Sequence, residues 1–172
     1  MDQTIEFIGK SKNGISVFVD PLHSHAVTHL KDTPHLKELV IEAISNLELR
    51  GKEVARHVEM GRFVGICDVV KVGADDTLIY GVRKNRDNDG LVPFVKNREG
   101  DPCSYVALHI VPLEDKTYLL SSAWIGLFGG DDEPFPQSPD ATPRSVAYWN
   151  KHAFIYGSQE IMAGTETPVC PW

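Results

Sequence analysis

Hydrophobic and polar residues change their spacing along the chain, and this change predicts short strands, then a long helix, then further strands. Near the N-terminus, apolar residues at 5–8 and 15–19 flank Asn13-Gly14, a pair that is typical of tight hairpin turns. The pattern therefore predicts two short strands paired as an N-terminal hairpin.

The strongest helical pattern covers residues 34–50. Thr33 can cap such a helix, Pro34 suits its first position, and Gly51 suits its end. We expect one main helix here because apolar residues recur at helical spacing, at Leu36, Leu39, Val40, Ala43, Ile44 and Leu47.

After the helix, runs rich in β-branched and aromatic residues alternate with turn residues, which favours strands. Pro93 predicts that the strand at 91–95 lies at a sheet edge, because proline cannot donate a hydrogen bond to a neighbouring strand. We expect an antiparallel sheet of about four strands. The predicted strands 62–72 and 77–82 form one hairpin and 105–113 and 117–125 form another, and residues 91–95 could add a short strand.

The C-terminal part is less regular. Residues 126–143 are rich in Gly, Pro and Asp and predict a long loop, and Thr142-Pro143 then begins a short helix that runs to about Lys151. The tail 157–172 is irregular, but Trp172 is costly to expose, so we expect the tail to dock on the rest of the chain.

Together these elements predict an α+β fold with an N-terminal hairpin, one main helix, an antiparallel sheet of about four strands, a short C-terminal helix and an irregular tail. The length fits a single domain over 1–172. Its parts are the hairpin and His-rich segment 1–33, the helix-plus-sheet core 34–126, and the loop, short helix and tail 127–172.

Composition narrows the classes of function. The chain has a formal net charge of −7, which disfavours sequence-independent attraction to nucleic acid, because that attraction comes from neutralising phosphates. In residues 83–98, however, basic side chains outnumber acidic ones. The sequence has neither a glycine-rich phosphate loop nor an apolar run of about 20 residues, so we expect no cofactor and no membrane association.

The cysteines point to a reducing compartment. Cys67, Cys103 and Cys170 are odd in number and lack metal-ligand spacing. Residues 1–10 do not have the basic start and apolar middle of a signal peptide. We therefore expect a cytoplasmic protein with reduced thiols.

His57 is the first candidate catalytic residue. It lies between the predicted helix and the strand at 62–72, and residues that do chemistry are often found at such junctions because a rigid scaffold holds them at the surface. Arg56 and Arg62 flank it, and nearby cations favour a neutral imidazole that can act as a base. The alternative interpretation is a surface histidine near a turn.

Basic residues at and after the end of strand 77–82 are candidate phosphate contacts. Arg83 and Lys84 are expected to be catalytic, because cations stabilise the charged phosphorane of RNA cleavage. Arg86 and Lys96 are expected to bind substrate. The alternative interpretation is a solvated basic turn.

The last strand and the short helix add further candidates. Period two places Tyr118, Ser122 and Trp124 on one strand face, with Ser122 as a catalytic group and both rings as substrate-binding groups. His152, at the end of the short helix, is a candidate acid partner for His57. Core packing and helix capping are the alternative interpretations.

A group of histidines precedes the main helix. If residues 24–30 were helical, His25 and His29 would share one face, as two metal ligands can. No Glu lies between them and no third ligand is set by spacing, so a metal site is the weaker interpretation.

The order of helix and four-stranded meander over residues 34–126, with His57 at the junction, basic residues on a middle strand and Ser122 on a late strand, resembles the barnase–EndoU–colicin–RelE group of nucleases. The resemblance implies a metal-independent endoribonuclease of toxin-like type, with RNA as substrate and a protein inhibitor as a candidate partner. The acidic chain and the segment from 127 onward depart from that group.

On this resemblance, His57 would act as base or acid, and Ser122 or Tyr118 would position the substrate. Arg83, Lys84 and Arg86 would bind phosphate. Three stretches, Arg83-Lys-Asn-Arg-Asp, Ser122-Ala-Trp-Ile-Gly and Tyr148-Trp-Asn-Lys-His-Ala-Phe, also resemble a bacterial family of uncharacterised proteins, which implies no activity.

Two other classes of function stay open at this point. One is a non-catalytic module that binds a ligand or a protein through the loop 126–143 and the aromatic C-terminal segment. The other is a metal-dependent hydrolase that uses His23, His25 and His29.

Overall fold

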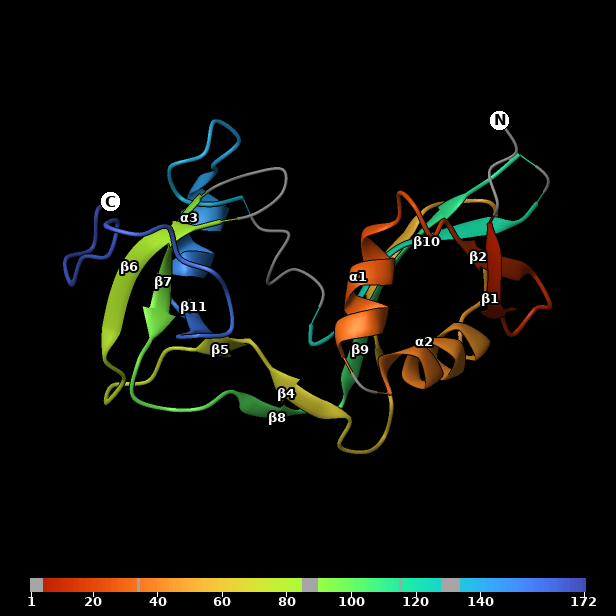
Figure 1. Ribbon diagram of the computed structural model, residues 1–172, viewed down its shortest axis with the longest axis horizontal. Coiled ribbons are helices and arrows are strands. Elements are labelled where there is room, and N and C mark those ends of the chain that lie inside the picture. The colour runs from red at the N-terminus through yellow and green to blue at the C-terminus, as the bar shows by residue number, and fades with distance from the viewer. Residues whose placement is uncertain (1–4, 34, 85–89, 115, 128–133) are drawn as a thin grey trace. The chain divides into compact units, whose positions relative to one another are not determined.

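A computed structural model describes residues 5–33, 35–84, 90–114, 116–127 and 134–172. The chain forms two compact units (Figure 1): unit 1 comprises Met1–Ile66 and Pro102–Phe128, and unit 2 comprises Cys67–Asp101 and Gly129–Trp172. Each unit contains helix and strand, so the α+β class is confirmed. The predicted core 34–126 is divided between the two units, and the single domain over 1–172 stays a prediction.

The described residues contain more strands than the sequence analysis predicted, and three helices. None of these helices is both long enough and apolar enough to cross a membrane. The helices are α1 (His25–Asp32), α2 (Leu36–Ser45) and α3 (Pro143–Trp149). The strands are β1 (Glu6–Lys10), β2 (Ser16–Val19), β3 (Val54–Glu59), β4 (Gly65–Cys67), β5 (Val69–Lys71), β6 (Leu78–Arg83), β7 (Gly90–Val95), β8 (Asp101–Cys103), β9 (Tyr105–Pro112), β10 (Tyr118–Ile125) and β11 (His152–Ile155).

Unit 1 is built on a five-stranded sheet with the order β1-β2-β10-β9-β3. The predicted hairpins are confirmed, since β1 pairs antiparallel with β2 and β9 with β10. β2 and β10 then pair in parallel, which joins the two hairpins into one sheet. The predicted four-stranded meander did not include this parallel pairing and is wrong here. Segments so distant in the sequence leave no local pattern that would indicate their contact.

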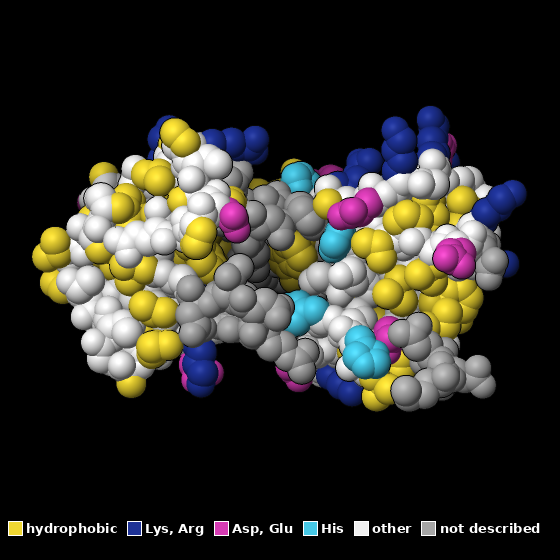
Figure 2. All heavy atoms as spheres, turned by 90° about the horizontal axis from the view of Figure 1, so that it is seen from above, with side chains coloured by type: hydrophobic (Ala, Val, Ile, Leu, Met, Phe, Trp, Pro, Cys, Tyr) yellow, Lys and Arg dark blue, Asp and Glu magenta, His cyan; other side chains and the backbone are white. Residues whose placement is uncertain are grey.

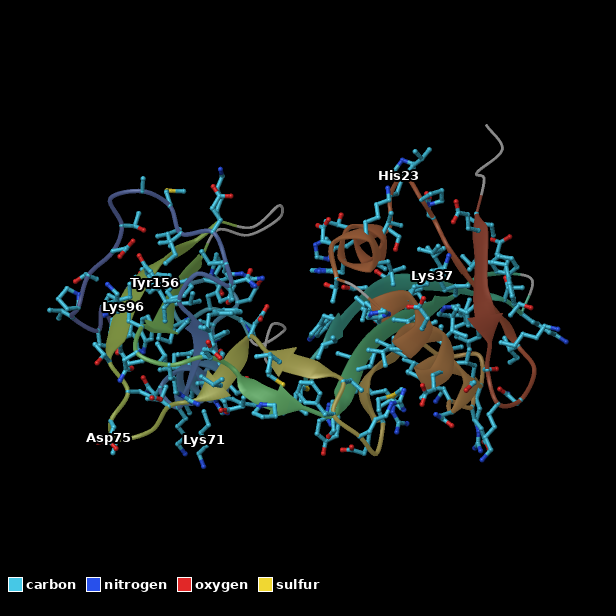
Figure 3. All side chains as sticks on the ribbon, turned by 60° about the horizontal axis from the view of Figure 1, so that its bottom comes forward. His23, Lys37, Lys71, Asp75, Lys96 and Tyr156 are labelled. Carbon is cyan, nitrogen blue, oxygen red and sulfur yellow. The ribbon has the colours of Figure 1, made fainter. Side chains whose placement is uncertain are left out.

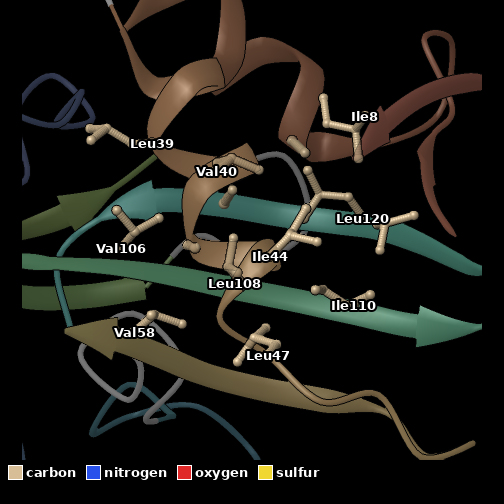
Figure 4. Packing of buried hydrophobic residues seen from close by; sticks show 14 of the residues in the cluster. Ile8, Leu39, Val40, Ile44, Leu47, Val58, Val106, Leu108, Ile110 and Leu120 are labelled. Carbon is tan, nitrogen blue, oxygen red and sulfur yellow. The ribbon is translucent and has the colours of Figure 1, made fainter. Parts of the chain in front are cut away.

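One face of this sheet packs against α2 (Figure 4), as the helical spacing of its apolar residues requires. Ala26 of α1 is buried in the same cluster, so both helices of unit 1 contribute to the core on this face. At its centre the cluster contains Val40 and Ile44 of α2, Val58 of β3, and Val106, Leu108 and Ile110 of β9.

The main helix is shorter than the predicted range 34–50. It begins at Leu36, after His35 in a left-handed conformation with φ 62°, and it ends at Ser45. Thr33 lies at the end of α1 instead of capping α2, and Pro34 lies outside the described residues. The predicted ends are therefore wrong, including the stop at Gly51.

Residues 46–50 leave the helix because the N-terminal hairpin offers their backbone other partners. The Asn13 side chain accepts a hydrogen bond from the Leu49 amide at 3.1 Å and donates one to the Leu49 carbonyl at 2.7 Å. The Lys12 amide donates to the Leu47 carbonyl at 2.8 Å. Leu47 and Leu49 are buried by these contacts, so their apolar character reflects packing outside a helix.

Two elements of unit 1 were not predicted. The His-rich segment forms α1, so the expectation of a single main helix is wrong. Residues 54–59 form β3, and His57 lies within this strand instead of at a helix–strand junction. The predicted strand 62–72 is divided into β4 and β5 on either side of Asp68.

Unit 2 contains a four-stranded sheet with the order β5-β11-β7-β6. β11 lies between β5 and β7, so the predicted hairpin of strands 62–72 and 77–82 is wrong. The edge position of Pro93 is wrong too, because β7 has a neighbour on each side. The register between β7 and β11 begins only at Phe94, so the missing amide of Pro93 does not interrupt it.

The predicted docking of the C-terminal segment is confirmed. Trp149 at the end of α3 stacks on Phe154 with ring centroids 5.3 Å apart. The tail forms a bridge between Thr167 and Tyr80, and the Trp172 indole nitrogen donates to the Asn150 side chain at 2.9 Å. These contacts explain why an irregular tail can remain in place.

Replacing Thr142 with alanine is expected to lower the free energy of unfolding by about 0.5–2 kcal/mol. Thr142 caps α3 by accepting from the Ser145 amide at 3.2 Å, and the Ser145 hydroxyl accepts from the Thr142 amide at 2.6 Å. Urea denaturation followed by circular dichroism measures the change. Thr142→Ser keeps the capping hydroxyl and should stay close to the wild type, and equal loss in both variants would contradict the capping role.

Replacing Tyr118 with phenylalanine is expected to raise the free energy of unfolding by about 1–3 kcal/mol, the cost of burying an unpaired polar group. Tyr118 is 1% exposed in the core of unit 1, and its hydroxyl has no hydrogen-bond partner within the described part of the chain. The same denaturation measurement tests this. A clear loss of stability would show that the hydroxyl has a partner in solution.

Candidate functional site

The second face of the unit 1 sheet gathers polar rings from three strands. Residues paired across antiparallel strands point to the same face. Val58 pairs with Val106 and both lie in the core, so the neighbouring positions point the other way. We call the surface formed by these side chains the open face; it includes His57, Glu59, Tyr105, Ala107, His109, Ser122 and Trp124.

A bulge in β10 decides which of its residues reach the open face. The register with β9 shifts between Leu120 and Ser122, so Ser121 is an extra residue and the alternation reverses there. The Ser24 hydroxyl donates to the Leu120 carbonyl at 2.5 Å beside this bulge. Ser122 and Trp124 therefore lie on the open face, whereas Tyr118 is in the core.

The prediction that Tyr118 shares a face with Ser122 and Trp124 is therefore wrong. Strict period two assumes that no residue is inserted, and the bulge inserts one. Tyr118 is removed from the candidate site, while Ser122 and Trp124 remain in it.

Two histidines lie diagonally on the open face. His57 pairs with Ala107 and His109 pairs with Ala55, so the two histidines are diagonal neighbours, a relation that spans about 7–8 Å between residues. His109 Nε2 is 2.6 Å from a carboxylate oxygen of Glu53, a contact that orients the ring. His57 lies edge-to-face with Tyr105, with ring centroids 5.1 Å apart.

The sequence analysis missed His109. Its signal was present, since Tyr105, Ala107 and His109 alternate along one predicted strand and so share a face. Only the pairing of β9 with β3 brings His109 close to His57, and β3 was not predicted.

Glu59 and Tyr105 form a pair at one end of the open face. The hydrogen bond from Tyr105 lowers the pKa of the Glu59 carboxyl, and further contacts with Ser104, the Gly61 amide and His57 act in the same direction. The pKa of Tyr105 is raised mainly by this bond to the carboxylate. Glu59 therefore carries a negative charge at neutral pH.

Arg62, one of the two cations expected beside His57, forms an ion pair with Glu42. Arg62 forms two contacts of 2.6 Å with the Glu42 carboxylate. Arg56 pairs with Leu108 and so projects toward the face opposite His57. The anionic Glu59 and the Tyr105 ring both interact with His57.

His25 and His29 share one face of α1, as a helical segment would require, with ring centroids 4.6 Å apart. His25 Nδ1 is 3.4 Å from the Ser122 hydroxyl, so this pair borders the open face. His23 projects from the loop before α1 (Figure 3) and contacts Asp20 at 3.0 Å. No group of three or more His, Cys, Asp or Glu residues suited to a metal ion occurs in the described part of the chain.

The predicted phosphate-binding residues Arg83 and Lys84 lie in unit 2, whereas His57 and Ser122 lie in unit 1. Arg83 donates to Gln159 at 2.9 Å and lies over the Phe154 ring at 4.6 Å. Lys84 contacts Glu160 at 3.0 Å. Arg86 lies outside the described residues.

The other two unit 2 candidates contact aromatic rings. Lys96 lies over Tyr156, with its nitrogen 4.9 Å from the ring centroid (Figure 3). His152 stacks on Tyr148 with centroids 4.0 Å apart, and its Nδ1 is 3.0 Å from the Tyr148 carbonyl oxygen. Unit 2 holds Arg83, Lys84, Lys96 and His152, so neither unit by itself contains the whole predicted set.

Comparison with known proteins gives no match, whether with protein families, curated proteins or solved structures. The candidate site therefore stands on its geometry: two histidines, a tyrosine–carboxylate pair, a serine and a tryptophan on one sheet face.

Proposed function

We propose that this protein is a metal-independent endoribonuclease and that the open face of unit 1 carries the reaction. The observation that supports the proposal most is the diagonal pair of histidines, His57 and His109, on adjacent strands. Cleavage of RNA by its own 2′-hydroxyl needs a base and an acid near one phosphate, and two imidazoles can supply both.

The reaction that fits this pair forms a bond from O2′ to phosphorus and breaks the bond from phosphorus to O5′. One imidazole takes the proton from O2′, and the other gives a proton to the leaving O5′. The products are a 2′,3′-cyclic phosphate and a 5′-hydroxyl. Glu53 holds the His109 ring by its 2.6 Å contact with Nε2, so we assign His109 as the acid and His57 as the base.

The neighbouring groups suit the rest of the substrate. Trp124 is in the same row across the sheet as His57, with Ala107 between them. An aromatic ring on an open sheet face can stack on an unpaired nucleobase. Ser122, in the row of His109, offers a hydroxyl that can donate to a phosphate oxygen.

Charge on the surface agrees with binding through rings more than through phosphate. In Figure 2, Lys and Arg side chains lie in several separate groups on the face shown. The net charge of −7 acts in the same direction.

The test is incubation of the purified full chain with single-stranded RNA in EDTA, with analysis of the product ends. We expect 2′,3′-cyclic phosphates, a rate that falls on both sides of a pH optimum, and no cleavage of DNA of the same sequence, which lacks the 2′-hydroxyl. RNA that stays intact across the pH range would overturn the proposal.

A further inference from the structure

The tail, residues 157–172, covers the outer edge of the unit 2 sheet. β6 is the last strand in the order β5-β11-β7-β6, so the backbone groups on its outer side need partners from outside the sheet. The tail supplies them: Tyr80 and Thr167 each donate an amide to the other's carbonyl at 2.8 Å, and the Lys84 amide donates to the Glu160 carbonyl at 2.9 Å. The tail therefore takes the place of a neighbouring strand.

Side chains of the tail also match this edge. The Val82 amide donates to the Thr165 hydroxyl at 2.9 Å, and Arg83 Nε donates to the Gln159 side chain at 2.9 Å. Backbone pairing alone would accept any extended segment, whereas these contacts depend on particular side chains. The segment that fits the β6 edge is therefore the tail sequence of this chain.

The tail can leave unit 2 without opening its core. None of the tail residues, all of which the structure describes, is fully buried. Ile161 and Trp172 pack against the unit 2 cluster while partly exposed, and Met162 and Val169 are 38% and 69% exposed. Release of the tail therefore costs mainly its contacts with the edge, and an identical tail can restore them.

A single turn joins the tail to β11. The Tyr156 amide donates to the Val95 carbonyl at 2.9 Å, and the Ser158 amide donates back to the Ile155 carbonyl at 3.0 Å. Gly157, the third residue of this turn, has φ 90°, which residues with a side chain rarely adopt. The direction of the tail thus depends on one glycine, and an extended backbone there would carry the tail away from its own unit.

We propose that the β6 edge binds the tail of a second copy of this chain, so that two copies exchange tails and form a dimer. In the closed form each tail lies on its own unit 2; the exchanged dimer keeps the same contacts between tail and edge, and only the turn at Gly157 changes. Docking within one chain has an effective concentration in about the mM range, so the wild type is expected to be monomeric in the µM range. The inference is independent of the RNA chemistry proposed for unit 1.

The test replaces Gly157 with alanine in the full chain and measures the molar mass by analytical ultracentrifugation over a range of concentrations. Alanine is strained at φ 90° in the closed form but not in an extended backbone, so exchange relieves the strain in both copies. The association constant is expected to rise about 30- to 900-fold, since each of the two turns contributes about 5- to 30-fold. Dimerisation should then occur at about 1–30 µM.

Gly164→Ala is the matched control. Gly164 also has a positive φ, 79°, and open space where a Cβ would lie, but it is within the tail. Its strain is therefore the same in the closed form and in the exchanged dimer. This variant should stay monomeric at the concentrations where Gly157→Ala dimerises, and equal dimerisation of the two variants would overturn the proposal.

A second substitution shows whether the tail holds the dimer together. Thr167→Pro removes the amide that donates to the Tyr80 carbonyl, so adding it to Gly157→Ala should return the chain to a monomer. If this double variant fails to fold, as judged by circular dichroism, Thr165→Ala takes its place and should weaken the dimer by removing the acceptor for the Val82 amide. The proposal is overturned by a Gly157→Ala chain that is monomeric at every concentration, or by a dimer that neither change in the tail weakens.

Discussion

Replacing His57 with alanine is expected to lower the rate of RNA cleavage by about 10²–10⁴-fold, the usual contribution of a general base. The imidazole is assigned to take the 2′-hydroxyl proton, and alanine has no group that can do so. Binding of a single-stranded 2′-O-methyl RNA hexamer, which cannot be cleaved because its 2′-hydroxyls are blocked, should change far less, because Trp124 remains. Single-turnover kinetics with saturating enzyme measure the rate of the chemical step separately from binding.

Two controls define what the loss means. His23→Ala removes a histidine of the same unit whose side chain is 71% exposed and pairs with Asp20, and it should cut RNA at the wild-type rate. The double variant of His57 and His109 should be little slower than the slower single variant, because a base and an acid that act together are not additive. Wild-type cleavage by His57→Ala would remove His57 from the mechanism.

Replacing Trp149 with alanine is expected to lower the free energy of unfolding by about 3–5 kcal/mol, as for other buried aromatic residues. Trp149 is 1% exposed at the centre of the unit 2 cluster. It stacks on Phe154 at 5.3 Å and contacts Phe135 at 5.8 Å, so alanine leaves a large cavity among rings that cannot close it.

Urea denaturation measures the total loss, and hydrogen exchange shows where it falls. Amides of β6 and β7, two neighbouring strands of the unit 2 sheet, should exchange faster in Trp149→Ala. Trp172→Ala is the matched control, because it also removes an indole but from a partly exposed site on the tail. A loss in Trp149→Ala no greater than that in Trp172→Ala would contradict the central role of Trp149 in this core.

Much of the local structure could be predicted from residue spacing. Asn13-Gly14 indicated the first hairpin, the alternation at 105–125 indicated the second, and Thr142-Pro143 indicated the start of α3. These signals are local, since a turn, a cap and a hairpin involve residues close together in the chain.

The candidate site was predicted only in part, for a reason that particular residues make plain. His57, Ser122 and Trp124 were named from the sequence and lie on one face of unit 1. His109 was missed because its neighbour β3 was not predicted, and Tyr118 was wrongly included because a bulge cannot be read from period two.

The sequence by itself determined the α+β class, the two hairpins, the position of the central part of α2 and the start of α3. The tertiary structure decided which strands are neighbours: β10 beside β2, β9 beside β3, and β11 between β5 and β7. Spacing reports only which face a residue occupies within its own element. Which distant residues share that face depends on pairing between segments far apart in the chain, and that pairing appears only when the whole sheet is assembled.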